Sequence, residues 1–248
     1  MRGTRTTTAR ATAARTTAAA AVGAALVLGL AACAGGPRGP VVTRDVEIED
    51  VTAVQLATSG DLTIRRGTTP SLTVTAREGT QDRLVSEVRD GVLVLDSRQS
   101  FGVGSWGDVS YDLVLGEVAE LVVSGSGDVT ADDVTGEALR LSVEGSGSVD
   151  LTGLDAETVA LRVAGSGDVE LDGRTGSLAI GIEGSGGIDA DRLRADEVDV
   201  SIEGSGDVEV HATRRLAVSI EGSGSVSYAG DPEVTQRIEG SGEVSRED

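Results

Sequence analysis

Apolar and polar residues alternate along most of this chain, and the alternation recurs every 18–20 residues. The repeats align on Gly-Ser-Gly, with aliphatic residues two positions before and two positions after each copy. Alternation with a period of two is typical of half-buried β-strands, and valine and isoleucine suit them. A repeat this regular predicts stacked units, one unit per copy. The copies begin at Gly125, Gly145, Gly165, Gly184, Gly204, Gly222 and Gly240.

No helical pattern separates these runs, which excludes doubly wound α/β folds because their parallel strands need helical crossovers. An antiparallel meander would not require like residues at matching positions, whereas a β-helix stacks each position on its own image. We therefore expect an all-β fold, a single-stranded parallel β-helix with about 18–20 residues per coil. Val143, Val163 and Ile182 should be vertical neighbours that face its interior.

Each Gly-Ser-Gly is predicted to turn a corner between two strands, because glycine adopts positive φ without a Cβ clash. The central serines should form a column whose hydroxyls hydrogen-bond along its length, since a hydroxyl both donates and accepts. The column would contain Ser59, Ser126, Ser146, Ser166, Ser185, Ser205, Ser223 and Ser241.

The chain before Gly125 repeats less well. Ser59-Gly60-Asp61-Leu62 is a degenerate copy, and three alternating runs follow it, at 72–76, 92–95 and 109–115. Asp90-Gly91 is a typical hairpin turn. We expect these runs to form further coils or a broadened end. At the other end Gln236 and Arg246 replace aliphatic residues, which predicts a terminal cap.

Residues 1–32 have the arginine-bearing start and short apolar run of a secretory signal. The run ends in Leu30-Ala31-Ala32-Cys33, which resembles the bacterial lipobox, and Cys33 is the only cysteine. We predict lipidation of Cys33, residues 33–42 as a flexible tether and residues 43–248 as the β-helix domain. The alternative is an ordinary cleavage site that precedes a free cysteine. One cysteine also excludes internal disulfides.

The formal net charge is −20, and without residues 1–32 it becomes −24, from 17 Arg and 41 acidic residues. Such a body is repelled by nucleic acid, so we expect no nucleic-acid partner. Aromatic residues make up 2% of the chain, which leaves the core to aliphatic side chains.

We expect no catalytic residues and no cofactor. Gly102–Gly107 fits G-x-G-x-x-G but lacks the strand before it and the helix after it that a dinucleotide site needs. Nearby, Phe101 and Trp106 could plug an end of the β-helix or form an exposed contact. The single histidine, His211, is expected in a solvated loop, and no Cys/His set for zinc exists.

Carboxylates form two columns. Directly after Gly-Ser-Gly, acids alternate with small neutral residues, which relieves like-charge repulsion. Directly before it, four glutamates should stack on consecutive coils and could supply oxygen ligands to calcium, although a solvated acidic stripe is the simpler interpretation. These calcium candidates are Glu183, Glu203, Glu221 and Glu239.

The body resembles the bacterial family "putative autotransporter adhesin, head GIN domain", from about Thr43 to Val244. The resemblance rests on Ser59-Gly60-Asp61, on Gly-Ser-Gly-Asp-Val copies such as 165–169 and 204–208, and on Tyr228-Ala229-Gly230-Asp231-Pro232. It implies a right-handed single-stranded parallel β-helix and an adhesion-like role, and it assigns no catalytic residues.

Together these observations predict an exported lipoprotein, anchored to the cell membrane on its extracytoplasmic face by lipid on Cys33. Its β-helix would serve as a binding or structural module for an envelope glycan, another protein or a second copy of itself. The alternative is a carbohydrate-active enzyme, a glycoside hydrolase or lyase, with carboxylates on a β-helix scaffold.

Overall fold

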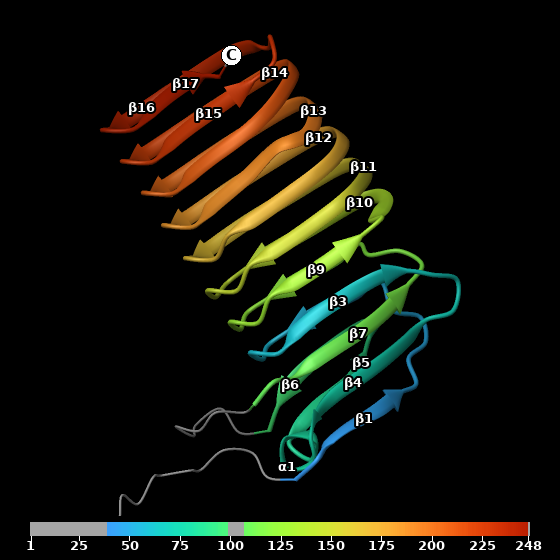
Figure 1. The fold of residues 1–248 in the computed structure, drawn as a ribbon. Helices are drawn as coiled ribbons and strands as arrows, with labels where there is room; N and C mark the ends of the chain where they lie inside the picture. Colours follow the sequence, from blue (N-terminus) through green and yellow to red (C-terminus); the bar gives the residue numbers. More distant parts are fainter. Residues whose placement is uncertain (1–38, 99–106, 248) are drawn as a thin grey trace, which may run out of the picture. The chain divides into compact units, whose positions relative to one another are not determined.

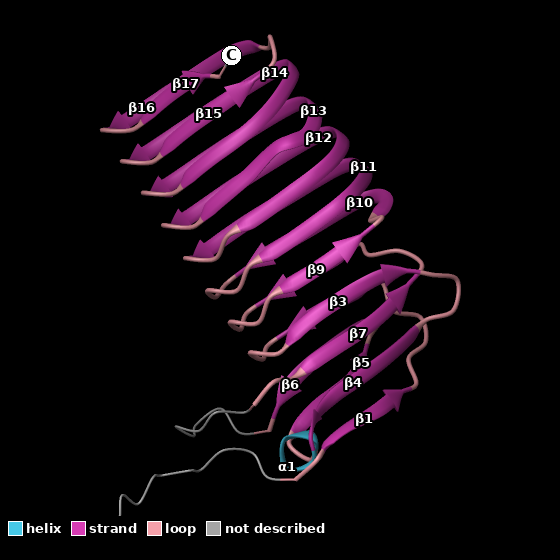
Figure 2. Ribbon diagram, viewed as in Figure 1, coloured by secondary structure: helices cyan, strands magenta, loops and turns pink. Residues whose placement is uncertain are grey.

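The computed structural model describes residues 39–98 and 107–247, which are mostly β-strand (Figure 2). The strands form a β-solenoid of about six turns, with each coil lying on the next (Figure 1). Val143 pairs with Val163, Val163 with Ile182, and Ile202 with Ile220. The predicted all-β fold class and the coil length of 18–20 residues are therefore confirmed.

In the described residues the only helix is α1 (Glu78–Gln81). The strands are β1 (Val41–Val46), β2 (Ala53–Leu56), β3 (Asp61–Arg66), β4 (Ser71–Arg77), β5 (Leu84–Arg89), β6 (Val92–Ser97), β7 (Ser110–Leu115), β8 (Glu120–Val123), β9 (Val129–Asp132), β10 (Thr135–Val143), β11 (Val149–Gly165), β12 (Val169–Gly184), β13 (Gly187–Gly204), β14 (Asp207–Gly222), β15 (Ser225–Ala229), β16 (Glu233–Gly240) and β17 (Glu243–Arg246).

The coils present two sheets. Sheet A contains, in spatial order, β5, β6, β2, β8, β10, the C-terminal halves of β11 to β14, and β16. Sheet B contains β1, β4, β7, β3, β9, the N-terminal halves of β11 to β14, β15 and β17. The chain passes from sheet A to sheet B at each Gly-Ser-Gly corner.

The interior is a set of aliphatic ladders. Val143 and Val163 are 0% exposed and Ile182 is 1% exposed, so these vertical neighbours face inward as predicted. Each such side chain contributes about 1.5–3 kcal/mol on burial. Because every coil shares its ladders with its neighbours, stacking provides most of the apolar burial.

The corners are held by their backbones. At Ser166 and Ser185 the N–H donates to the first glycine of the preceding corner, at 3.2 and 3.0 Å. The predicted ladder of serine hydroxyls is wrong, because the described hydroxyls of this column point to solvent and form no hydrogen bond with one another.

Positive φ is confirmed at the first glycine of the later corners, for example 138° at Gly184. A second requirement was not foreseen. A Cβ added at Gly147 would lie 2.2 Å from the carbonyl oxygen of Gly127, in the corner below. Glycine is therefore needed because neighbouring corners touch through their backbones.

The N-terminal coils are not stacked in chain order. The coil of β2 and β3 lies between β6–β7, which comes later in the chain, and β8–β9. Beyond β6–β7, the strands β5, β4 and β1 are antiparallel and close this end with α1. Both expectations for this region are confirmed, since it contains further coils and a broadened end. Asp90 and Gly91, both at positive φ, form the predicted turn between β5 and β6.

The C-terminal end differs, because in the described residues no strand covers β16 and β17. Ile238 continues the inward ladder of Ile202 and Ile220, yet it is 36% exposed. Val234 and Val244 are also only partly buried.

Candidate functional site

The outer face of sheet A carries a shallow groove of about 600 Å³, which crosses β10 to β14 and reaches β16. Outward positions on a sheet usually carry long polar side chains, but here the floor is made of small ones. It is formed mainly by Ala160, Ala179, Gly181, Ser201, Ala217 and Ser219. The floor is shallow because small residues occupy most positions of two outward columns, one of which Asp199 interrupts between Ala179 and Ala217.

Charged pairs lie around this floor. Arg162 on β11 forms an ion pair with Glu183 on β12, and Arg237 forms one with Glu239 within β16. These arginines occupy the same column, on coils at either end of the floor. Between them Arg215 donates to Asp199 at 3.2 Å. The groove therefore has a floor of mainly small residues with Asp199 among them, and charged side chains of both signs around it.

Arg140 lies at the β10 side of the groove and is exposed. It has no ion-pair partner among residues 39–98 and 107–247. An exposed guanidinium without an intramolecular carboxylate can form a charge-assisted hydrogen bond to a bound acidic group.

The four predicted glutamates stack in register beside this groove. Glu183 pairs with Glu203, Glu203 with Glu221, and Glu221 with Glu239 along consecutive coils. Arginines neutralise the first and last of them. In the part of the chain that the structure describes, no group of three or more acidic, histidine or cysteine side chains is arranged to hold a metal. Calcium binding stays a prediction that this arrangement does not strengthen.

The acids after the corners have a structural role. On sheet B, Asp128 accepts the backbone N–H of Ser148 at 2.9 Å, and Asp168 accepts that of Gly187 at 3.0 Å. Each carboxylate thus accepts the backbone N–H of the small residue that occupies the same column on the next coil. The alternation of acids and small residues thus builds hydrogen bonds between coils, besides separating like charges.

Sheet B carries a second, acidic hollow that includes Asp168, Asp189, Asp207 and Glu209. Partial burial and the neighbouring carboxylates raise the pKa of Glu209. Partial burial and a hydrogen bond with Asp189 likewise raise the pKa of Asp191. This surface therefore has an excess of negative charge.

Catalytic chemistry finds little support in the described residues. The corner serines are exposed, and no histidine lies in their column to act as a base. His211 lies within β14 and is half-buried, so its predicted loop position is wrong. Three of the carboxylates beside the groove, Glu183, Asp199 and Glu239, are ion-paired with arginines, whereas glycoside hydrolysis needs two carboxyl groups facing each other across the scissile bond.

The groove itself was missed from the sequence. The available signal was the residue type at three and five positions before Gly-Ser-Gly, where alanine, glycine and serine recur instead of long polar residues. The reasoning had followed the inward columns and the charged ones, and these small outward residues belong to neither.

Several predicted features lie outside the described residues: the signal segment at 1–32, Cys33, and the aromatic pair Phe101 and Trp106. In the residues that are described, no helix combines the length and apolar character needed to cross a membrane.

Comparison with known proteins gives a family and a fold. The sequence model of the family described as "Putative auto-transporter adhesin, head GIN domain" matches residues 50–232. Curated proteins provide no sequence match.

Solved structures share this fold. A protein described as a putative adhesin from Bacteroides fragilis is 25% identical, with a TM-score of 0.82 over 86% of this chain and 99% of its own. A protein described as a putative lipid binding protein from Parabacteroides distasonis is 24% identical, with a TM-score of 0.73 over 86% of this chain and 99% of its own. At that identity the second likeness shows the fold alone.

Proposed function

Because this chain belongs to the family "Putative auto-transporter adhesin, head GIN domain", we propose that it is a non-catalytic surface module that binds another protein of the cell envelope through the sheet A groove. The family implies a surface or extracellular protein, and the similar structure from Bacteroides fragilis is described as a putative adhesin. The observation that carries the proposal is the small-residue floor bordered by charges of both signs.

The groove suits an extended polypeptide. A floor of methyl groups, hydroxyls and one glycine allows a partner backbone to approach closely along the stacked strands. The bordering Arg140, Arg162 and Arg237, together with Asp199, offer hydrogen-bonding partners for both acidic and basic side chains. Among the described residues, no aromatic side chain lines the groove, whereas pockets for small ring-shaped ligands are commonly lined by aromatic side chains.

The experiment is to fill the groove. Ser201→Trp places a large side chain at the centre of the floor, where the serine is exposed and the fold should tolerate it. Ser225→Trp, on the exposed face of sheet B, is the matched control. Bacteria displaying each variant are tested for retention of cell-envelope proteins and for adherence. Loss with Ser201→Trp alone supports the proposal, and equal behaviour of the two variants contradicts it.

The carbohydrate-active alternative is tested with the acids beside the same groove. Asp199→Asn combined with Glu203→Gln removes two of them without changing side-chain shape. The unmodified chain and the double variant are incubated with envelope polysaccharides. Cleavage by the unmodified chain that is lost in the double variant would contradict the proposal of a non-catalytic module.

We also propose that lipid on Cys33 holds the module at the membrane. The supporting features are the Leu-Ala-Ala-Cys sequence and the apolar run that precedes it. Cys33→Ser should abolish incorporation of radiolabelled fatty acid and leave the precursor unprocessed. Unchanged labelling would contradict the anchor.

A further inference from the structure

Among the described residues, no strand pairs with the backbone groups at the C-terminal edge of the solenoid. In sheet A the outward-facing Arg140 and Glu144 donate their N–H groups to Ala119 and Val123 of the preceding coil. Alternate residues of a strand point their backbone groups to opposite sides, so the inward-facing residues serve the next coil. In sheet B, Val129 shows this directly by donating to Ser148 of the following coil.

In the last coil the corresponding inward residues are Val234, Gln236 and Ile238 on β16. Their N–H and C=O groups point away from β14, and no described strand accepts them. Their side chains continue the interior ladders, and Ile238 is one of only three large apolar residues exposed in the described part of the chain. This edge thus offers both unpaired backbone groups and apolar surface.

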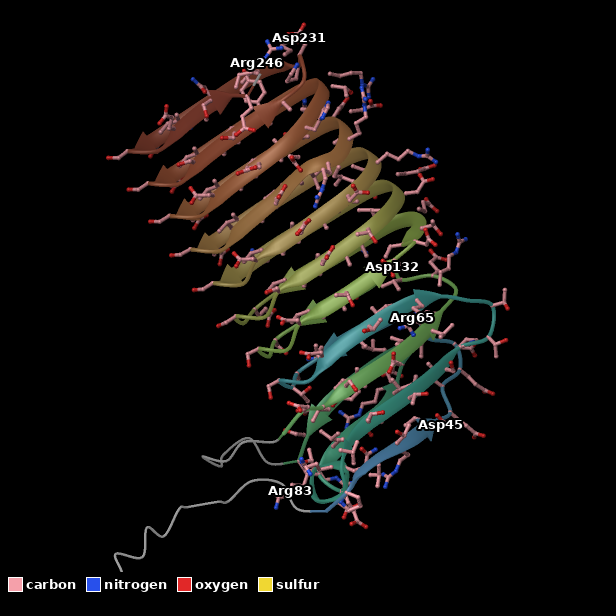
Figure 3. The ribbon with its side chains drawn as sticks, in the orientation of Figure 1. Asp45, Arg65, Arg83, Asp132, Asp231 and Arg246 are labelled. Atoms are coloured by element: carbon pink, nitrogen blue, oxygen red, sulfur yellow. The ribbon has the colours of Figure 1, made fainter. Side chains whose placement is uncertain are left out.

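The edge lacks most of the features that usually prevent pairing. Solvent-exposed edge strands commonly carry proline, a bulge or inward-pointing charges. The inward positions of β16 are valine, the neutral amide of Gln236 and isoleucine. The charge of Arg246 on β17 is compensated by Asp231, to which it donates at 3.2 Å, and the two lie together at this end in Figure 3. The opposite end, in contrast, is closed by antiparallel strands and α1.

We infer that two copies of this chain associate end to end, by antiparallel pairing of β16 with β16 of the second copy about a two-fold axis at Gln236. In this register Val234 faces Ile238 of the second copy, and Gln236 faces its own image. The three inward residues of each strand then form hydrogen-bonded pairs, and the two interiors become continuous.

The self-complementary register favours a second copy over an unrelated strand. In this register Glu239 faces Glu233 of the second copy directly, and Arg237, which forms an ion pair with Glu239 of its own chain, lies diagonally across from the same Glu233. Each arginine is therefore shared by two carboxylates, which limits the repulsion between them. The two amides at Gln236 can donate to and accept from each other, which makes the pair self-complementary inside the joined interior. Both copies are acidic, so their net repulsion should weaken association at low salt.

The first test is cross-linking of the full chain in the bacterium that displays it. Gln236→Cys places two cysteines on the proposed axis, at the Cα separation of about 5.5 Å that a disulfide accepts. Ser227→Cys on sheet B is the control, and the unmodified chain gives the background from Cys33. A disulfide-linked species of twice the chain mass, formed only with Gln236→Cys, supports the proposal. Its absence, or a cross-linked species of any other mass, overturns it.

The second test separates edge pairing from the stability of the last coil. Gln236→Pro removes an N–H that points to the free edge, and proline is tolerated on an edge strand in that position. Gln236→Ala keeps the N–H. The full chain is studied by sedimentation in excess detergent micelles. The dimer dissociation constant should rise about tenfold or more for the proline variant and change little for the alanine variant. The unmodified dimer should strengthen as salt rises. Equal dimerisation of the two variants, or no dimer at high salt, overturns the inference.

Discussion

The coils from β8 onward and the region before them are built on the same unit but are stabilised in different ways. From residue 120 to residue 247, hereafter the regular stack, every described coil after the first lies next to the one that precedes it in the chain. Residues 39–98 and 107–119, hereafter the N-terminal region, change that order and add antiparallel strands. In the regular stack neighbouring corners contact each other through backbone atoms, whereas in the N-terminal region side chains such as that of Tyr111 lie next to the corner glycine.

The largest predicted effect follows from this contrast at the corners. Gly147→Ala would push a methyl group to 2.2 Å from the carbonyl oxygen of Gly127, and backbone cannot move away without breaking the stack. In the N-terminal region, the nearest atoms to a methyl at Gly60 belong to the side chains of Tyr111 and Val109, at 2.8 and 2.9 Å. We expect a loss of about 4 kcal/mol for Gly147→Ala and about half of that for Gly60→Ala, from denaturant unfolding.

The control for both variants is Gly181→Ala, because the nearest atom to its added methyl lies 4.0 Å away. Gly181→Ala should leave stability unchanged or raise it by a few tenths of a kcal/mol. If all three substitutions cost the same, backbone contact at the corners is not what distinguishes the two regions.

A second prediction divides the regular stack itself. Ile202 is 0% exposed and Ile238, two coils later in the same column, is 36% exposed. Ile202→Ala should cost about 3 kcal/mol, as deletions in well-packed cores do. In dilute protein, where copies are separated, Ile238→Ala should cost about 1 kcal/mol. Equal losses in urea unfolding would show that the last coil is as well covered as the middle.

A third prediction concerns the hydrogen bonds between coils on sheet B. Asp128→Ala removes the acceptor of the Ser148 N–H and should cost about 1 kcal/mol. Asp207 occupies the same column, but the N–H above it, on Ser225, donates to the Gly206 carbonyl at 3.2 Å. Asp207→Ala should therefore have little effect. Matching shifts in the melting temperature of the two variants would contradict this account of the alternating acids.

The smallest predicted effect is on pH dependence. The pKa of Glu209 is raised by partial burial and by neighbouring acids, so the folded chain holds this proton at pH values where the unfolded chain has released it. Its contribution to stability is present below the usual glutamate pKa of 4.5 and is lost as pH rises through the higher folded pKa. Glu209→Gln should flatten that decline in melting temperature.

The pKa of Asp155, in the same stack, is shifted in the opposite direction. The Arg174 guanidinium hydrogen-bonded to it lowers its pKa, so its contribution is present above the usual aspartate pKa and is lost as pH falls. Asp155→Asn should lower stability near neutrality and change it little at the lowest pH values, so the melting temperature of the variant should fall less on acidification. If Asp155→Asn reduced the loss of melting temperature on raising the pH, as Glu209→Gln should, the direction assigned to the Asp155 pKa shift would be contradicted.

Much of the regular stack could be predicted because each inward position repeats its own chemistry. The ladder of Val143, Val163 and Ile182 follows directly from alternation and period. The Asp90-Gly91 turn was also predictable, because few residue pairs adopt two positive φ angles. The lipid anchor and the calcium hypothesis are untested by the described residues.

The order of the N-terminal coils could not be predicted. The inward face of β2–β3 is aliphatic like that of the other coils, so alternation gives no information about which coils lie next to it. The strand β5 was missed because Leu84 and Val85 are adjacent apolar residues and break the alternation. The groove was missed because most residues of its floor are small and uncharged, and a single small residue indicates no binding site until stacking brings several of them together.

The placement of β2–β3 between two coils made later in the chain has a mechanical consequence. Tension applied at the N-terminus first separates β1 from β4, strand by strand, and then meets a coil clamped on both sides. That coil can leave only if both of its neighbours give way together, so the force is shared between two rows of hydrogen bonds. Force applied from the N-terminal side is therefore resisted by a coil that is hydrogen-bonded on both sides, whereas force applied from the C-terminus would remove the coils one at a time.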